Sequence, residues 1–275
     1  MTQEGLMLTI SNHDFQRFTS FIKERYGLDL SRKQHLIAGR LSSTITTLGF
    51  SNFSDYVDYI ISSRDQKEIE NMLNRLTTNY TFFMRESSHF DYFRSTVLPY
   101  LEQTKKERVL SIWSAGCSYG QEPYTLSMIL KDYFGSKASS WDTRVLATDI
   151  SQEALHFASR GEYDKDSLKD IPSNWMTKYF SPSTTPDMLM VKPEIRANVI
   201  FKTFNLMDPI QFRLKFDVIF CRNVMIYFDL PTKLSLVNRF YNASNTGGYL
   251  FIGHSESIGN STPYRYLMPA VYRKL

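Results

Sequence analysis

Residues 108–134 constrain the fold of this chain more than any other stretch. The apolar run 108–113 predicts a buried strand, and the turn that follows it contains Gly116 and Gly120. Pro123 then opens a segment with apolar residues at helical spacing, and proline suits a first helical turn because its missing N–H has no partner there. Taken alone, the two glycines favour an ordinary tight turn over a ligand-binding one. Followed by a helix, they predict an α/β sheet with a small ligand at the helix N-terminus.

A second predicted strand runs from Thr143 to Ile150 and carries an acid, Asp149, near its end. In dinucleotide-binding sheets, an acid at this place accepts hydrogen bonds from the ribose hydroxyls. Asp149 could instead cap the helix that follows, but Ser151 is equally suited to that role and leaves the carboxylate to a ligand. The two strand ends together favour a nucleoside-binding α/β domain.

Three further predicted strands, 199–204, 216–221 and 248–253, are each followed by polar residues. Open α/β sheets bind their ligands at the carboxyl ends of the strands, so these residues are candidates for the site. A helix is expected at 231–243, and residues 264–275 are expected to supply a closing strand or hairpin.

The plain alternation of strand and helix is interrupted between residues 164 and 196. Short strands predicted at 178–180 and 188–191 flank a turn-rich link. We therefore expect a small antiparallel insertion at about 172–197.

The first 77 residues predict helices and no strand. The expected helices are 12–26, 32–48, 53–63 and 66–76. A patterned all-helical stretch of this size is expected to form a separate subdomain, 1–77, ahead of a catalytic domain at 78–275.

Helix 32–48 has no carboxylate, and its pattern would place Arg32, Lys33 and Arg40 on one basic face. Only three cations are involved, so chance composition of a solvated face is the alternative interpretation.

Composition and residue spacing argue against a membrane protein, a metal site and a nucleic-acid partner. No apolar run approaches the roughly 18 residues of a membrane helix, and the N-terminus lacks a signal-peptide pattern, so we expect a cytoplasmic protein without membrane insertion. The two cysteines have no metal-ligand spacing and the five histidines are scattered, so no metal site is expected. The net charge of +4 favours acidic partners, and we expect no nucleic acid among them.

Five ordered motifs resemble the CheR-type chemoreceptor glutamate methyltransferases over nearly the whole chain. They are Asn79-x-Thr81 with Arg85-Glu86, the turn from Trp113 to Tyr124, Ala147 to Ile150, Asn205-Leu206, and Cys221 to Phe228. The sequence departs from the family pattern at Met84, where a second Phe is usual, and at Gly116, where Ala is common.

The resemblance implies a Rossmann-like methyltransferase domain with S-adenosylmethionine as cofactor and S-adenosylhomocysteine as product. It implies methyl esterification of receptor glutamates, with Arg85 and Tyr227 in catalytic or positioning roles. By position it assigns the cofactor site to Asn79, Thr81, Arg85, Gly116, Glu122, Asp149, Asn205, Leu206, Arg222 and Asn223.

The roles of the two catalytic candidates leave alternatives. A cation on the nucleophilic carboxylate would stabilise the ground state more than the charge-neutralised transition state. We therefore favour Arg85 as a clamp on the cofactor carboxylate, or as an orienting group near the sulfur, over direct activation of the substrate. Tyr227 is expected to bond the substrate, with a place in the aromatic core as the alternative.

The resemblance also implies a partner, the cytoplasmic helical bundle of methyl-accepting chemotaxis receptors. We expect Arg32, Lys33 and Arg40 to dock its carboxylates. Relatives that tether to a receptor's C-terminal pentapeptide carry a Gly-x-Gly-Gly turn in the small insertion, where the peptide adds as an edge strand. Residues 181–187 contain no glycine and two prolines, so we expect pentapeptide-independent recognition by a monomeric enzyme.

Two rival classes fit part of the sequence. A Rossmann dehydrogenase would explain Asp149, but its Gly-x-Gly-x-x-Gly fingerprint is absent. A non-catalytic S-adenosylmethionine-bound signalling or receptor-binding module would keep the fold and lose turnover. Cys117 and Cys221 are expected to be free thiols that fill space near the pocket, not nucleophiles.

Overall fold

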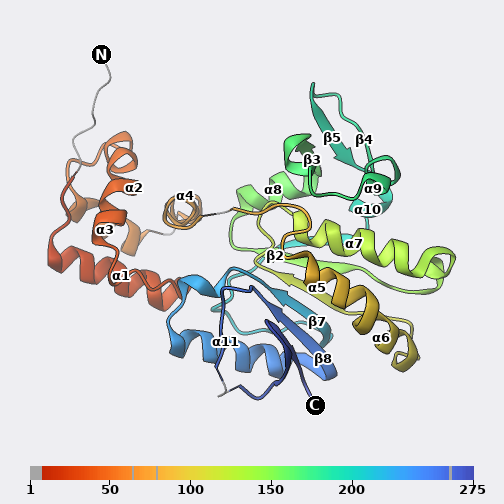
Figure 1. Ribbon diagram of the computed structural model, residues 1–275. Coiled ribbons are helices and arrows are strands. Elements are labelled where there is room, and N and C mark those ends of the chain that lie inside the picture. Colours follow the sequence, from red (N-terminus) through yellow and green to blue (C-terminus); the bar gives the residue numbers. More distant parts are fainter. Residues whose placement is uncertain (1–7, 64, 79, 260–261) are drawn as a thin grey trace. The chain divides into compact units, whose positions relative to one another are not determined.

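The computed structural model describes residues 8–63, 65–78, 80–259 and 262–275. The chain divides into two compact units (Figure 1). The helical unit comprises Met1–Asn79 with Tyr227–Thr232, and the α/β unit comprises Tyr80–Ile226 with Lys233–Leu275.

Four helices build the helical unit, and their starts follow local capping chemistry. They are α1 (Asn12–Tyr26), α2 (Gln34–Thr47), α3 (Phe53–Ser62) and α4 (Gln66–Leu76). Side chains of Ser11, Asn52 and Asp65 accept the first free backbone N–H groups of α1, α3 and α4. The segment 227–232 joins this unit through a backbone bridge between Leu28 and Phe228.

The predicted helix 32–48 begins later than expected, at Gln34, with Lys33 as its N-cap. Arg32 and Lys33 therefore precede the helix, and the prediction that they share a helical face with Arg40 is wrong. The Arg40 side chain has a structural role, because its Nη1 donates to the carbonyls of Arg75 (3.1 Å), Leu76 (3.0 Å) and Thr77 (3.3 Å). These carbonyls end α4, where backbone acceptors lack helical partners and carry partial negative charge.

The α/β unit is built on a seven-stranded sheet of order β6-β2-β1-β7-β8-β10-β9. The strands are β1 (Ile112–Ala115), β2 (Val145–Asp149), β6 (Val199–Thr203), β7 (Phe216–Cys221), β8 (Ser244–Ile252), β9 (Arg265–Met268) and β10 (Val271–Arg273). The first five in spatial order pair in parallel, and β10 runs antiparallel to both of its neighbours. This largely parallel sheet confirms the predicted α/β class, and β9 with β10 forms the expected closing hairpin.

Helices cover both faces of the sheet, and β1 shows why. Successive strand residues point to opposite faces. Ser114 bonds Glu122 of α7 (Gln121–Phe134), whereas Trp113 packs edge-on against Phe240 of α11 (Leu230–Ala243). The two helices therefore lie on opposite faces (Figure 1). The other helices of the unit are α5 (Ser87–Tyr92), α6 (Leu98–Thr104), α8 (Gln152–Arg160), α9 (Ser173–Tyr179) and α10 (Pro193–Arg196), with a π-helical turn at Phe93–Val97 and 3₁₀ turns at Gly135–Ser140, Asp166–Leu168 and Met225–Tyr227.

The small insertion differs from its prediction in extent and in detail. It is a three-stranded antiparallel sheet of order β3-β5-β4, with β3 (Glu162–Asp164) lying outside the predicted range, β4 (Phe180–Pro182) and β5 (Met188–Val191). Residues 178–179, predicted as strand, end helix α9 instead. One helical face brings Trp175 Nε1 (2.7 Å) and Tyr179 Oη (2.5 Å) to the carboxylate of Asp132 on α7, a tertiary contact that favours helix.

Two other segments depart from the expected pattern. The strand predicted from residue 108 begins only at Ile112, and α5 to α6 occupies residues 87–104, for which no structure was predicted. None of the described helices combines the length and apolar character needed to cross a membrane.

Candidate functional site

The predicted cofactor residues of the α/β unit gather at the carboxyl ends of four adjacent strands. β1 lies between β2 and β7, so the chain crosses over to one side and then to the other. Such a switch point is where open parallel sheets bind ligands. Gly116 follows β1, Asp149 ends β2, Asn205 and Leu206 follow β6, and Arg222 and Asn223 follow β7.

Asp149 is fixed by two backbone donors, one for each carboxylate oxygen. Its Oδ2 accepts the N–H of Ser118 (2.8 Å), and its Oδ1 accepts the N–H of Ser151 (3.0 Å). Ser151 also caps α8 through the N–H of Ala154 (3.1 Å), which decides between the two caps that the sequence allowed, so Asp149 is not needed in that role. The carboxylate thus ties the turn after β1 to the end of β2.

The turn after β1 carries a polar atom that calls for a ligand. Ser118 adopts a left-handed backbone (φ 49°), and its Oγ is buried without a hydrogen-bond partner among the residues that the structure describes. A buried hydroxyl without a partner is costly, and a bound polar ligand relieves that cost. Sequence analysis did not single out Ser118, although it lies in the motif beside Gly116.

A buried ion network lies at the end of β7. Only 3% of the Arg222 side chain is exposed, and its Nη1 donates to Glu122 Oε2 (3.1 Å) while Nη2 donates to Glu86 Oε2 (3.2 Å). The backbone carbonyl of Arg85 also accepts from Nη2. Glu122 Oε1 in turn accepts from Ser114 Oγ (2.7 Å). One guanidinium therefore holds two carboxylates from α7 and from the segment before α5.

Burial acts in the same direction on the two carboxylates, but their net pKa shifts are opposite. Burial raises the pKa of Glu122 against the opposing effects of Arg222 and Ser114. Burial also acts to raise the pKa of Glu86, but Arg222, Asn223 and the His254 N–H together lower it below its usual value. Glu86 is therefore the firmly ionised partner of Arg222.

Within the described part of the chain, one group has metal-ligand composition. Glu86, His89 and His254 bring their donor atoms within 4.8 Å of one another. A cation there would face the Arg222 guanidinium, which already bonds Glu86 Oε2, the oxygen that lies 3.4 Å from His89 Nδ1. Burial lowers the pKa of His89 to about 4, so its imidazole is neutral near pH 7, which is the form that can ligate a metal; the Arg222 charge is what opposes a cation here. We assign no metal to this group.

Arg85 does not reach this network with its side chain. Its Nη1 donates to the Tyr80 carbonyl (2.6 Å), and its guanidinium lies 6.0 Å and 5.9 Å from the ring centres of Tyr80 and Phe82. Both neighbours, Met84 and Glu86, have left-handed backbones, which turn the segment sharply. Thr81, another predicted cofactor residue, lies half-buried in the same segment.

Asn205 and Leu206 lie beside Asp149 through the pairing of β6 with β2. The N–H of Phe204 donates to the Asp149 carbonyl (3.0 Å), and Leu206 is buried. Asn205 Oδ1 accepts the N–H of Met207 (2.9 Å), which closes a tight turn after β6.

Tyr227 belongs to the helical unit. Its hydroxyl accepts the N–H of Thr78 (3.1 Å) and lies 3.3 Å from the Thr78 carbonyl, to which it can donate. The side chain is half-buried, so it is not part of the aromatic core. Asn79, the next residue after Thr78 and a predicted cofactor contact, lies outside the described residues.

Cys117 and Cys221 are buried free thiols, as expected. Burial raises the pKa of both well above the ordinary thiol value, so neither is a thiolate near neutral pH. A protonated, inaccessible thiol is a poor nucleophile.

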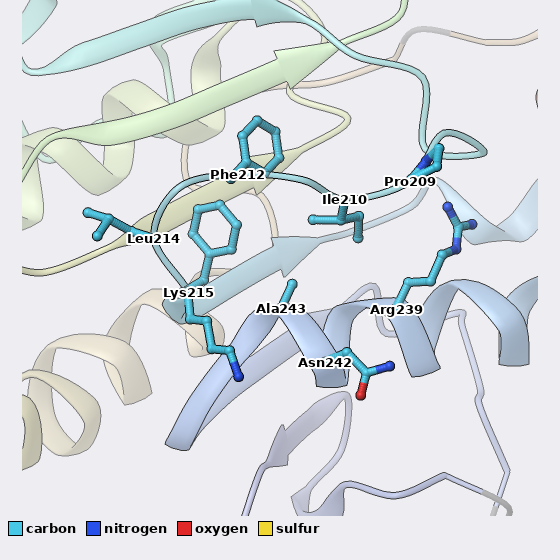
Figure 2. Close-up of a pocket in the computed structure, with 9 residues that line it drawn as sticks. Pro209, Ile210, Phe212, Leu214, Lys215, Arg239, Asn242 and Ala243 are labelled. Atoms are coloured by element: carbon cyan, nitrogen blue, oxygen red, sulfur yellow. The ribbon is translucent and has the colours of Figure 1, made fainter.

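A cavity of about 340 Å³ lies away from the strand-end residues, between the 209–216 segment and the C-terminal end of α11 (Figure 2). It is lined by Pro209, Ile210, Phe212, Leu214, Lys215, Phe216, Arg239, Asn242 and Ala243. Its walls include the first residue of β7, which is at the edge opposite the site, and none of the predicted site residues.

Known proteins resemble both units. Residues 13–77 match the CheR methyltransferase all-alpha domain, and residues 79–272 match the CheR methyltransferase SAM binding domain. The chain is 38% identical over 275 residues to a chemotaxis protein methyltransferase of Borreliella burgdorferi, covering 98% of this chain and 97% of the relative.

Two further relatives are similar at comparable coverage. A probable chemotaxis protein methyltransferase of Rhizobium etli is 36% identical, covering 88% of this chain and 95% of the relative. The chemotaxis protein methyltransferase of Escherichia coli is 34% identical, covering 92% and 87%. Similarity of this extent across both domains shows that the chain belongs to the CheR methyltransferase family, whose cofactor is S-adenosylmethionine.

Proposed function

We propose that this protein transfers a methyl group from S-adenosylmethionine to glutamate side chains on the cytoplasmic helical bundle of chemoreceptors. The products are glutamate methyl esters and S-adenosylhomocysteine. The observation that carries the proposal is the end-to-end similarity to chemotaxis methyltransferases of a chain whose strand ends hold an ordered charged site. The relatives named above are all methyltransferases, so nothing there favours a non-catalytic module.

The residues at the strand ends suit the parts of this cofactor. Asp149 would accept from the ribose hydroxyls, beside the unpartnered Ser118 hydroxyl. The Glu122 and Arg222 pair offers opposite charges to the amino-acid end of the cofactor, which itself carries both. The rest of the cofactor site would be lined by Asn205, Leu206, Asn223, Gly116 and Thr81. Arg85 would clamp the cofactor carboxylate, and Asn79 is a further cofactor contact in this proposal.

The reaction asks little proton chemistry of this chain. S-adenosylmethionine supplies a methyl group made electrophilic by its sulfonium centre. The substrate glutamate, with an ordinary pKa of about 4.3, is already ionised near pH 7, so no general base is required. The neutral His89 and the protonated cysteines agree with this. The protein's own task is to orient the carboxylate and to exclude water, and Tyr227 would hydrogen-bond the substrate.

Receptor fragments incubated with labelled S-adenosylmethionine should gain label that mild base releases, because methyl esters are base-labile. Arg85→Ala and Tyr227→Phe should each lower kcat/KM roughly tenfold, the worth of about one charge-assisted or neutral hydrogen bond. Neither variant should introduce a bell-shaped pH dependence near neutrality.

Arg265→Ala is the matched control, since Arg265 is exposed on strand β9 at the far edge of the sheet. It should keep wild-type activity. Label that resists base, or label absent from the receptor, would refute glutamate methylation.

We also propose that Arg32 and Lys33 help to dock the receptor, whereas Arg40 stabilises the fold of the helical unit. Both Arg32 and Lys33 are exposed ahead of α2. Arg40 is bound to the end of α4, so its substitution tests the fold and not the interface.

The structure of the small insertion supports recognition without the receptor's C-terminal pentapeptide. β4 is an edge strand, but Pro182 on that edge has no N–H to donate to an added strand. The turn that follows is closed by its own bonds, from Ser183 N to Met188 O (3.1 Å) and from Thr185 N to Ser183 Oγ (3.0 Å).

Three variants separate these contributions in one methylation assay. The double charge reversal Arg32→Glu with Lys33→Glu should slow receptor methylation several-fold at low salt and leave cofactor affinity unchanged, because exposed charges act over about 10 Å at 0.1 M salt. Lys67→Glu, on exposed α4 surface, is the control. Arg40→Gln should instead lower the stability of the helical unit by about 1 kcal/mol.

Deleting the receptor's C-terminal tail should leave the methylation rate unchanged. Micromolar binding of the isolated tail peptide, measured by calorimetry, would contradict pentapeptide independence. An equal loss of rate in Lys67→Glu and in the double reversal would contradict a local dock at Arg32 and Lys33.

A further inference from the structure

Glu256, four residues beyond the end of strand β8, is a buried carboxylate with no role in the site described so far. Only 7% of the residue is exposed. Its Oε2 accepts the N–H groups of Gly253 (2.5 Å) and Asn223 (3.0 Å), and its Oε1 accepts the N–H of Ile226 (3.1 Å). One side chain therefore grips the loop 223–226 at both of its ends and ties that loop to the end of β8.

The loop after β7 needs such a grip because its conformation is unfavourable by itself. Asn223 has a left-handed backbone (φ 59°), which residues other than glycine adopt rarely. The end of β8 approaches it as closely as glycine permits. A Cβ placed on Gly253 would lie 2.6 Å from Asn223 Nδ2 and 2.9 Å from its backbone nitrogen. The N–H groups that converge there need one common acceptor, which Glu256 supplies.

The conformation that Glu256 holds also determines where the site residues point. Asn223 Nδ2 donates to Glu86 Oε1 (3.2 Å), and Arg222, directly before it, bonds Glu86 and Glu122. A rotation of the loop backbone at residue 223 would withdraw the Asn223 amide from Glu86. It would also disturb the strand end from which the Arg222 side chain emerges.

We propose that Glu256 is a positioning residue of the methyl-transfer site, acting through Asn223 and Arg222 without touching the cofactor or the substrate. The inference rests on the proposed function, in which those two residues line the cofactor site. The acid is required because both oxygens accept from backbone N–H groups. An amide at this position would set an NH₂ donor against at least one of them.

The test compares Glu256→Gln with a matched variant of a buried acid near the start of the neighbouring strand β7. Asp217, 1% exposed, lies near the start of β7 and accepts the Ser111 N–H (3.0 Å) and Asn245 Nδ2 (2.8 Å), and it pairs with Lys105. Asp217→Asn therefore removes a buried charge with comparable bonds at the edge opposite the site. Glu256→Asp keeps the acid but draws its oxygens back by one methylene.

Thermal unfolding, calorimetric titration with S-adenosylhomocysteine and steady-state kinetics should be measured at a temperature where every variant is folded. Glu256→Gln and Asp217→Asn should both lower Tm. Only Glu256→Gln should weaken S-adenosylhomocysteine binding, by about tenfold, and lower kcat at saturating cofactor. Glu256→Asp should show smaller losses of Tm, S-adenosylhomocysteine affinity and kcat. It replaces Glu256→Gln in the comparison with Asp217→Asn if Glu256→Gln does not fold.

Equal Kd and kcat in the folded Glu256 and Asp217 variants would overturn the proposal and leave Glu256 a stabilising residue alone. The titration stands apart from the receptor assay. A wild-type protein that binds S-adenosylhomocysteine yet forms no base-labile ester would refute the proposed reaction, while the Kd values would still decide the role of Glu256.

Discussion

Replacing Arg222 with methionine is expected to lower the free energy of unfolding of the α/β unit by about 3–5 kcal/mol and to abolish measurable cofactor binding. The side chain is 3% exposed and bonds Glu86 and Glu122 at 3.2 Å and 3.1 Å. Its removal leaves two largely buried carboxylates, 15% and 14% exposed, without a counter-charge, which costs far more than the pair itself contributes. All three tryptophans, Trp113, Trp141 and Trp175, lie in this unit, so their fluorescence during denaturation reports its stability.

The loss of stability in Arg222→Met should be larger at high pH than at low pH. In the wild type, Arg222 helps to depress the pKa of Glu86, so that contribution is present above the unfolded pKa of about 4.3 and fades as pH falls through the lower folded value. Glu122 already has a raised pKa, and without Arg222 both carboxyl groups should titrate higher. A carboxyl group whose folded pKa exceeds its unfolded pKa destabilises the fold increasingly as pH rises from the unfolded pKa to the folded pKa, and the full effect remains above the folded pKa. The loss of unfolding free energy in Arg222→Met, relative to wild type, should therefore become smaller as pH falls from 8 to 5.

Arg144→Met is the matched control. Arg144 pairs with Asp142, but 59% of its side chain is exposed, and exposed pairs contribute little. Its substitution should change stability by less than about 1 kcal/mol at either pH. Two outcomes would contradict this prediction: similar losses of unfolding free energy in the two variants, or a loss in Arg222→Met that does not vary with pH. Either would show that Arg222 does not offset the charges of Glu86 and Glu122.

Replacing Asp149 with alanine is expected to weaken S-adenosylmethionine and S-adenosylhomocysteine binding by about 1.5–3 kcal/mol, roughly tenfold or more. The proposed contact with the ribose hydroxyls accounts for part of this loss. The structure adds a second cause, because the same carboxylate holds Ser118 and Ser151 through their N–H groups at 2.8 Å and 3.0 Å. Calorimetric titration gives the affinity directly.

Asp149→Asn separates the two causes, since the amide keeps one acceptor oxygen but loses the charge and the second acceptor. It should bind more tightly than the alanine variant and more weakly than wild type. Asp142→Ala, which removes a half-exposed carboxylate just before β2 begins, should leave the affinity unchanged. An unaltered Kd for Asp149→Ala would remove Asp149 from the cofactor site.

Local sequence was sufficient to predict the sheet and which residues follow its strands. The run Phe216–Cys221, apolar except for Asp217, forms β7 over those same residues, because a strand buried on both faces needs mostly apolar side chains. Once strands are parallel, their carboxyl ends meet at one edge. Asp149, Asn205 and Arg222 could therefore be grouped from sequence alone, as residues that end or follow strands.

Tertiary structure decided which partner each of these side chains received. Arg222 bonds Glu86 across 136 residues of sequence, Arg40 caps a helix 35–37 residues away, and Asp132 binds Tyr179 across 47 residues. Periodicity and capping act within a few residues, so they predicted a basic helix face containing Arg40 and a strand at Tyr179. Neither exists, because hydrogen-bonding groups are satisfied by whatever the packed elements bring within reach, and sequence spacing does not contain that information.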